Sequence, residues 1–218
     1  MLHSNVVVQE CPVNIAVLAS GSGSNAEALM AHFSQGEAAR VGRIAWVCTN
    51  RREAGVRERA ERFGIPHSHV SREDIQSGQL DDELMSRGIE WIALAGFLLR
   101  VPRSICQTYE GRMVNIHPAL LPNFGGEGMF GMRVHHAVHA AGETRSGMTI
   151  HWVNESYDEG DIVFQAEVDL TLQDGPEDIA AKVLELEHRH YPKVLEGLIR
   201  IAQGTDVRDG SHIQSHQS

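Results

Sequence analysis

Short apolar runs rich in Val, Ile and Ala alternate along this chain with segments of helical period. That alternation is typical of β-α-β units, in which a helix connects neighbouring strands of a parallel sheet. We therefore expect a single-domain α/β fold with a Rossmann-like, mainly parallel sheet and helices on both of its faces. The last two expected strands, Gly147 to Val153 and Ile162 to Val168, are joined by a polar connection suited to a hairpin, so they should form an antiparallel pair.

The remaining elements follow from the same patterns and from helix start and stop signals. Further strands are expected at Asn14 to Ala19, Arg43 to Cys48, His67 to Val70, Trp91 to Ala95 and Met113 to Ile116. Helices are expected from Asn25, which could cap the first of them, to Ser34, at Glu53 to Phe63, at Asp81 to Arg87, from Pro102, at Arg133 to Ala141 and from Pro176. Pro192 should kink or split the last helix.

The length of 218 residues suits one domain with a full core. We expect that domain at residues 14–204, after an N-terminal extension at 1–13 and before a disordered tail at 205–218. The formal net charge of −10 disfavours nucleic-acid binding, which depends on cations that neutralise phosphates. Three cysteines without a C-x-x-C pair, no long apolar run and no signal peptide predict a cytoplasmic protein that does not bind membranes.

A glycine-rich loop, Gly21-Ser22-Gly23-Ser24-Asn25, lies between the first expected strand and its helix. Free N–H groups and the helix dipole attract anions at such a position, so we expect a phosphate there. With Ala26 the loop also matches the dinucleotide fingerprint G-x-G-x-x-A. NAD is disfavoured because no acidic residue ends the second strand, but an NADP-binding module stays open, as does a glycine turn that only packs helix on strand.

A second chemical feature is Asn115-Ile116-His117-Pro118, at the end of an expected buried strand. Alternation along a strand places Asn115 and His117 on one face, where an amide donor and an imidazole could stabilise an oxyanion while protons move. A single strand-end histidine is more often structural, although open α/β sheets bind ligands at this edge. Asp158, in a glycine-containing turn, is ordinary turn chemistry unless the fold brings it to this pair.

Taken together, these segments resemble the folate-dependent phosphoribosylglycinamide formyltransferase family of purine synthesis. The resemblance covers about residues 14–204, nearly the whole chain. It is carried, in family order, by Ala19 to Asn25, Leu94-Ala95-Gly96-Phe97, Asn115 to Pro118 with Leu120-Leu121-Pro122, Gly147-x-Thr149-Ile150-x-Trp152-Val153 and Tyr157-Asp158-x-Gly160.

The resemblance implies a formyltransferase fold at residues 14–204 that moves a formyl group from 10-formyltetrahydrofolate, its co-substrate, to glycinamide ribonucleotide without a metal. Asn115, protonated His117 and Asp158 would be catalytic, with Thr149 and His151 supporting Asp158. The loop Gly21, Ser22, Gly23, Ser24 and Asn25 would hold the nucleotide phosphate and Glu187 the ribose. The folate pocket would be lined by Phe97, Leu98, Leu99, Arg100 and Val101. Monomer and homodimer both stay open.

Some positions depart from the family pattern. Asn123 and Glu127 stand where basic residues are expected near the nucleotide phosphate, so Arg133 could take over that anchoring. Leu99 occupies a place where an arginine often stands, and the charge is found at Arg100 instead.

Three histidines, His135, His136 and His139, fall on one expected helix, and we interpret them as a solvated face rather than a metal site. Two related activities are disfavoured. A methionyl-tRNA formyltransferase would carry a C-terminal RNA-binding domain, which we do not expect here. A formyl-folate deformylase would carry an extra N-terminal domain, for which the thirteen residues before the first expected strand leave no room.

Overall fold

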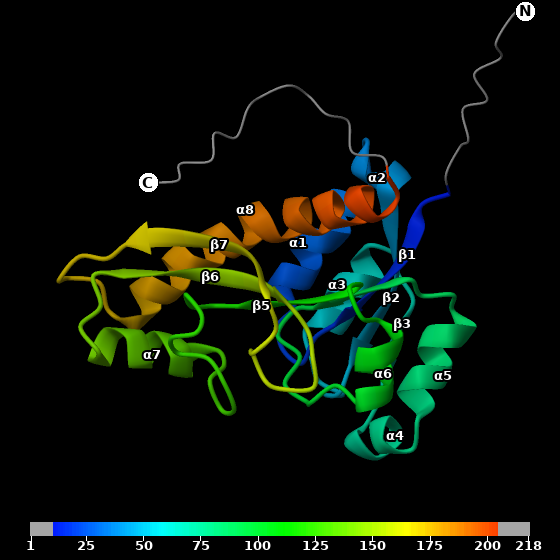
Figure 1. Cartoon of the computed structure of the whole chain (residues 1–218), viewed down its shortest axis with the longest axis horizontal. Helices are drawn as coiled ribbons and strands as arrows, with labels where there is room; N and C mark the ends of the chain where they lie inside the picture. The colour runs from blue at the N-terminus through cyan, green and yellow to red at the C-terminus, as the bar shows by residue number, and fades with distance from the viewer. Residues whose placement is uncertain (1–10, 205–218) are drawn as a thin grey trace, which may run out of the picture.

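Within residues 11–204, the part of the chain that this computed structural model describes, seven strands form one sheet. They are β1 (Val13–Leu18), β2 (Gly42–Thr49), β3 (His67–His69), β4 (Trp91–Leu94), β5 (Met113–His117), β6 (Arg145–Trp152) and β7 (Ile162–Asp169). The strand order is β3-β2-β1-β4-β5-β6-β7 (Figure 1). Neighbours from β3 to β5 are parallel, whereas β6 is antiparallel to both β5 and β7. The predicted α/β fold with a C-terminal antiparallel pair is confirmed.

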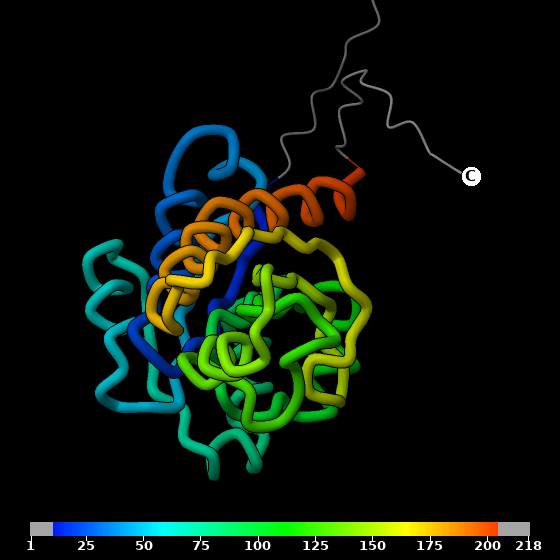
Figure 2. Tube along the Cα trace, turned by 90° about the vertical axis from the view of Figure 1, so that its left-hand side faces the viewer, coloured from blue at the N-terminus to red at the C-terminus, as the bar shows by residue number. Residues whose placement is uncertain are grey.

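The helices surround this sheet. They are α1 (Ser24–Phe33), α2 (Ala38–Val41), α3 (Val56–Arg62), α4 (Arg72–Gln76), α5 (Gln79–Ser86), α6 (Arg103–Thr108), α7 (Met132–Ala140) and α8 (Pro176–Ala202). One hydrophobic cluster joins the sheet to α1, α3, α7 and α8, and a second joins it to α4, α5 and α6. Figure 2 shows α8 lying beside α1 along the top of the molecule. The predicted tail at 205–218 and residues 1–10 of the predicted extension lie outside the described residues.

Of the kink or split expected at Pro192, the split is wrong, because Pro192 lies inside one continuous helix α8, where it is buried next to Tyr191. A proline there removes one N–H donor, and burial of the surrounding apolar face keeps the helix together. Asn25 does not cap α1, since the helix begins at Ser24 after an N-cap at Gly23. The short helices α2 and α4 were not anticipated.

The last helix is fixed to the middle of the sheet by a buried hydroxyl. The Tyr191 Oη atom lies 2.9 Å from the Leu94 carbonyl oxygen and 3.3 Å from the Val114 carbonyl oxygen. These carbonyls belong to neighbouring parallel strands, with Leu94 at the carboxyl end of β4 and Val114 near the start of β5. The tyrosine therefore sets the position of α8 relative to the strand that carries Asn115 and His117.

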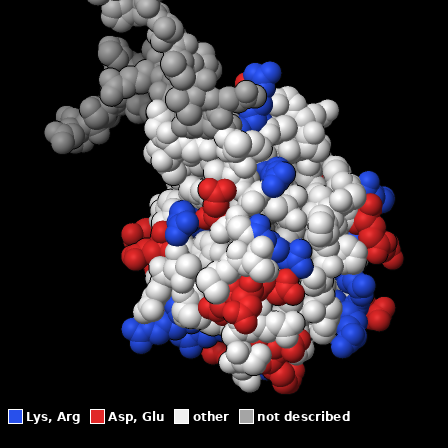
Figure 3. Space-filling view, turned by 90° about the vertical axis from the view of Figure 1, so that its right-hand side faces the viewer, with Lys and Arg blue, Asp and Glu red and all other residues white. Residues whose placement is uncertain are grey.

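Charged side chains of both signs are mixed on the face drawn in Figure 3, with no large basic area. Of the helices in the described residues, none is both long and apolar enough to span a bilayer.

Candidate active site

A cleft of about 580 Å³ opens at the carboxyl ends of the parallel strands β1, β4 and β5. Open α/β sheets bind ligands at this edge. The structure brings most of the predicted site residues to the cleft, although they come from distant parts of the sequence. Its lining includes Gly21–Asn25, Phe97–Val101, Asn115, His117, His151, Asp158 and Glu187. Thr149 is not part of the lining.

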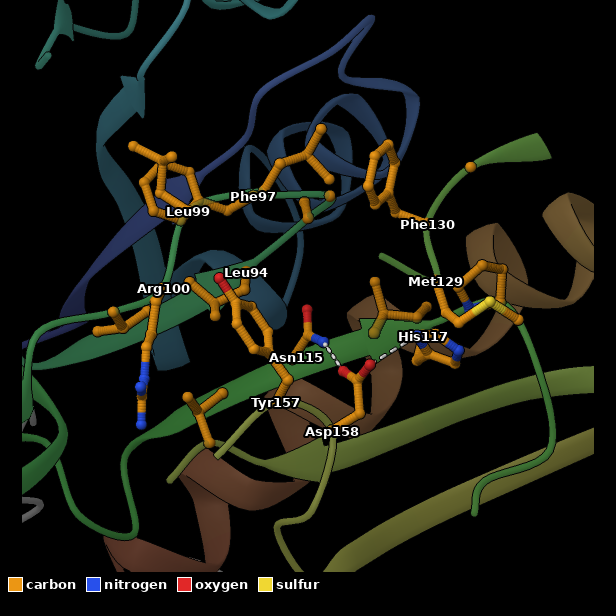
Figure 4. A pocket seen from close by; sticks show the side chains of 18 of the residues that line it. Leu94, Phe97, Leu99, Arg100, Asn115, His117, Met129, Phe130, Tyr157 and Asp158 are labelled. Carbon is orange, nitrogen blue, oxygen red and sulfur yellow. Dashed lines mark hydrogen bonds and ion pairs between the residues drawn. The ribbon is translucent and has the colours of Figure 1, made fainter. Parts of the chain in front are cut away.

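Asn115 and His117 project from β5 on the same face of the sheet, as strand alternation requires (Figure 4). The antiparallel pairing of β5 with β6 places His151 opposite Asn115. The Asn115 amide nitrogen lies 3.1 Å from His151 Nε2 and donates to Asp158 Oδ1 at 3.3 Å. The amide is thus held between an imidazole and a carboxylate at the floor of the cleft.

Asp158 joins this pair from the connection between β6 and β7. Its Oδ2 atom lies 3.4 Å from His117 Nδ1 and accepts a hydrogen bond from the Gly126 N–H at 3.0 Å. Its backbone φ of 54° is a conformation in which Asp and Asn are several-fold enriched. The turn also depends on Gly160, where a β-carbon would lie 1.7 Å from the Trp152 carbonyl oxygen. The backbone geometry of the turn therefore positions the Asp158 carboxylate next to His117 and His151.

His117 is enclosed and oriented on both sides of its ring. Nε2 donates to the Phe124 carbonyl oxygen at 2.8 Å, which leaves Nδ1 facing Asp158. Burial lowers the pKa of His117 and outweighs the Asp158 carboxylate and the Phe124 carbonyl, which both raise it. The free cleft therefore favours a neutral ring. The protonated form expected from the sequence is therefore not the form that the free cleft favours.

The Asp158 carboxyl group is ionised in the same setting. Burial alone would raise its pKa, but the adjacent His151 and His117 rings and the hydrogen bond from the Gly126 N–H together hold the pKa below its ordinary value. Ring nitrogens of two histidines lie within 3.4 Å of its oxygens. A proton that reaches either imidazole is therefore stabilised by a fixed negative charge.

The two residues predicted to support Asp158 differ in what they contact. His151 donates from Nδ1 to the Trp152 carbonyl oxygen at 2.8 Å, which turns Nε2 toward Asn115 and Asp158. Thr149 makes no such contact. Its hydroxyl donates to the Ala119 carbonyl oxygen at 2.6 Å and accepts from the Leu121 N–H at 3.0 Å, so it stabilises the turn that follows His117.

The glycine loop reaches the cleft at the first turn of α1. No side chain caps this helix, so the N–H groups of its first turn have neither an intrahelical partner nor a cap. Gly23 has a φ of 79°, and a β-carbon there would lie 2.5 Å from the Val56 β-carbon. A β-carbon built on Gly21 would have no other protein atom within 4 Å. Gly23 is therefore required by the fold, while the space beside Gly21 is open to a ligand.

Glu187 enters the cleft from α8 and meets the first turn of α1. Its Oε2 atom accepts a hydrogen bond from the Asn25 amide at 2.8 Å. Burial raises the pKa of Glu187 to about 7, although the Asn25 hydrogen bond acts in the opposite direction. The carboxyl group is thus poised between its two protonation states near neutrality.

The opposite end of the cleft is formed by Phe97–Val101. The Leu98 N–H donates to the Ser20 hydroxyl at 2.8 Å, which fixes the start of this segment against the glycine loop. Arg100 donates from Nε to the Glu155 carbonyl oxygen at 2.9 Å, and its guanidinium group points away from Asn115 in Figure 4. Arg133, expected near the nucleotide phosphate, does not line the cleft and stacks over the Phe130 ring at 4.9 Å.

Several lining residues were not predicted from the sequence. Arg72 lies at the start of α4, a helix that is stabilised by a capping box between Ser71 and Asp74. That Ser-x-x-Asp pattern is the signal that could have located it. Interpreting all three histidines of α7 as a solvated face is wrong for His135, which is buried in the cleft wall. His136 and His139 are exposed, and no group of His, Cys, Asp or Glu side chains suited to a metal ion occurs among residues 11–204.

Comparison with known proteins places this site in a family context. A family model described as formyl transferase matches residues 13–195. A chloroplastic phosphoribosylglycinamide formyltransferase of Arabidopsis thaliana is 39% identical over 187 residues, which are 83% of this chain and 63% of the plant protein. The enzyme of the same name from Haemophilus influenzae is 32% identical over 205 residues, covering 90% and 93% of the two chains. This chain thus spans about three fifths of the plant relatives.

Solved structures give the same result. The phosphoribosylglycinamide formyltransferase of Coxiella burnetii superposes with a TM-score of 0.77 at 34% identity and 88% coverage of both chains. The protein of the same name from Anaplasma phagocytophilum gives a TM-score of 0.78 at 31% identity, covering 87% of this chain and 88% of that one.

Proposed function

This chain belongs to the formyl transferase family, and from that premise we propose that it transfers a formyl group from 10-formyltetrahydrofolate to glycinamide ribonucleotide. The primary amine of the nucleotide attacks the formyl carbon, the bond from that carbon to N10 of the folate breaks, and one proton moves from the amine to N10. The products are N-formylglycinamide ribonucleotide and tetrahydrofolate.

The observation that carries this proposal is the meeting of three groups from separate segments. The Asp158 carboxylate lies within hydrogen-bond reach of the Asn115 amide at 3.3 Å and 3.4 Å from the His117 ring. Acyl transfer to an amine needs a donor for the oxyanion and a group that moves protons. An amide, an imidazole and a carboxylate in one buried cluster supply both.

The protonation states of His117 and Asp158 in the free cleft indicate which step of the reaction each group assists. A neutral His117 can take up the proton that the attacking amine loses, and Asp158 then stabilises the imidazolium. Asn115 donates to the developing oxyanion, for which its amide must turn one N–H from its resting partners toward the substrate. The proton returns to the leaving folate nitrogen from the same ring or through a water.

The two ends of the cleft suit the two substrates. The uncapped first turn of α1 binds the nucleotide phosphate, and Glu187 accepts hydrogen bonds from the ribose hydroxyls. The segment Phe97–Val101 offers apolar side chains and backbone groups to the pterin ring. Arg72 and Arg100 are the cations available there for the carboxylates of the folate glutamate.

The reaction is proposed to take place in the cytoplasm. Cys11, Cys48 and Cys106 are all unpaired, which suits a reducing compartment.

A spectrophotometric assay of formyl transfer tests the function directly. The protein is mixed with glycinamide ribonucleotide and a 10-formyl folate, and release of the deformylated folate is followed. We expect turnover that needs both substrates, and turnover reduced by roughly 10²- to 10³-fold in an Asn115→Ala variant. Parallel reactions offer NADPH to the protein or replace the nucleotide with methionyl-tRNA. Activity only in one of those reactions would overturn the proposal.

A further inference from the structure

One imidazole in the cleft wall has no role in the reaction just described. His135 lies on α7 and is 6% exposed, whereas its neighbours His136 and His139 on the same helix are exposed. Its ring is part of the lining of the cleft, together with the glycine-rich segment Gly126–Gly131 that precedes α7. A buried polar ring on a helix that could have turned it outward needs a partner.

The hydrogen bonding of this ring is incomplete. Nδ1 is enclosed by protein and has no partner among the described residues. An enclosed N–H without an acceptor is costlier than an enclosed lone pair, so the ring proton belongs on Nε2. Burial, with smaller contributions from His117 and His136, lowers the pKa of His135 and keeps the ring neutral. His135 therefore presents Nε2–H as a donor to whatever occupies the cleft.

The position of the His135 ring indicates which of the two proposed substrates it contacts. α7 packs against α8, the helix that carries Glu187, and His135 lies close enough to His117 for the two rings to interact electrostatically. On the folate side, Phe97, Leu99 and Val101 pack instead into the hydrophobic cluster around α4, α5 and α6. We therefore assign His135 to the nucleotide side of the cleft, near His117.

Building on the proposed function, we propose that His135 binds the nucleotide by donating Nε2–H to the carbonyl oxygen of its glycinamide group. That carbonyl is separated from the attacking amine by one carbon, so it is the acceptor nearest to the reacting atom. Holding it stops rotation of the amine about that carbon and aims its lone pair at the formyl carbon.

A set of three variants separates this contact from a structural role. In His135→Gln the amide nitrogen replaces Nε2 as a donor, whereas His135→Leu fills the space without one. His136→Leu removes an exposed imidazole from the same helix as a control. Calorimetry measures binding of glycinamide ribonucleotide alone. We expect Kd to rise roughly three- to tenfold for His135→Leu, the loss of one neutral hydrogen bond, and to stay within about twofold for His135→Gln and His136→Leu.

Thermal unfolding and kinetics complete the test. Because Nδ1 gains no partner in the folded protein, His135→Leu should unfold at the parent temperature or above it, while the KM for the nucleotide rises and the KM for the folate does not. If His135→Leu does not fold, His135→Asn, whose shorter amide does not reach as far, replaces it in the comparison with His135→Gln.

The outcomes distinguish this inference from the proposed function. A parent protein that neither binds the nucleotide nor transfers the formyl group overturns the proposed function and the contact with it. A parent that does both, with His135→Leu binding the nucleotide as tightly as the parent, overturns the contact alone. An equal loss of affinity for both substrates assigns His135 to the structure of the cleft, and the contact is again wrong.

Discussion

Asp158 combines two demands that few residues can meet at one position. Its backbone φ of 54° excludes most side chains, and its carboxylate contacts His117, His151 and the Gly126 N–H. From the sequence, an aspartate before a glycine in a turn is unremarkable. Its meeting with β5 could not be derived from local patterns, because it depends on the antiparallel pairing of β6 with both neighbours. Only the family resemblance assigned it a role.

The Asp158→Asn variant separates charge from fold. Asn tolerates the same backbone conformation, so the protein should fold and bind both substrates. Losing the charge that stabilises an imidazolium should lower kcat by roughly 10²- to 10⁴-fold, as measured in the formyl-transfer assay. Asp161→Asn, an exposed change in the same connection, is the control. A folded Asp158→Asn protein with turnover within about tenfold of the parent would remove this residue from the proton path.

Glu187 predicts a pH dependence of stability. Its pKa is raised from the ordinary value of 4.5 to about 7 in the folded protein, so the folded state binds the proton more tightly than the unfolded state. Below pH 4.5 the Glu187 carboxyl group is protonated in both states and does not destabilise the fold. As the pH rises to about 7, its burial lowers the free energy of unfolding progressively, by on the order of 3 kcal/mol in total.

Unfolding by urea between pH 4.5 and pH 8 tests whether ionisation of Glu187 lowers the free energy of unfolding as the pH rises. The advantage of Glu187→Gln over the parent should grow as the pH rises and level off above about pH 7. Glu185→Gln, an exposed change on the same helix, should show no such trend. A difference between Glu187→Gln and the parent that is the same at every pH would mean that Glu187 titrates normally in the fold.

At the scale of elements, apolar runs located β1, β2, β4 and β5 to within a few residues because strands that are largely buried leave a simple apolar signature. The predictions that were wrong concern helices. α2 and α4 are too short for a period to show, and Pro192 stays inside α8 because tertiary packing compensates for one lost hydrogen bond. Nor could the sequence distinguish His135 from His136, since that depends on how α7 lies against α8.

Substitutions at the two glycines of the loop before α1 should have different effects, a loss of stability at Gly23 and a loss of nucleotide affinity at Gly21. Gly23→Ala places a β-carbon on Val56 at a φ of 79°, so it should destabilise the protein by about 2 kcal/mol or more in urea unfolding. A β-carbon at Gly21 meets no protein atom within 4 Å, so Gly21→Val should fold normally, but it narrows the space where the phosphate is expected. Its nucleotide Kd should rise by about fivefold or more in calorimetry, with folate Kd unchanged. Normal nucleotide binding by Gly21→Val would place the phosphate elsewhere.

On the scale of the whole molecule, the formal net charge is −10, and charges of both signs are mixed on the face drawn in Figure 3. Binding of an anionic nucleotide therefore relies on the local groups of the cleft rather than on a general attraction. Within the described residues, the lining of the cleft comes from segments between the loop after β1 and α8, so occupation of the cleft by the proposed substrates should stabilise the domain as one unit.

Thermal unfolding with ligands measures that coupling. At 100 times its Kd, each substrate should add about 2.7 kcal/mol, which raises Tm by about 5 to 10 °C for a domain of this size. NADPH at the same concentration should leave Tm unchanged. A shift with NADPH and none with either substrate would favour the dinucleotide-binding alternative.

The Asn25–Glu187 contact joins residues separated by 162 positions, and Tyr191, one turn after Glu187, contacts the carbonyl oxygens of Leu94 in β4 and Val114 in β5. During synthesis on the ribosome the glycine loop emerges early, but Glu187, the proposed ribose ligand, follows only when α8 has left the exit tunnel. Until then the nascent chain contains the proposed catalytic residues Asn115, His117 and Asp158 without that carboxyl group. Docking of α8 is therefore the step that completes the proposed nucleotide site.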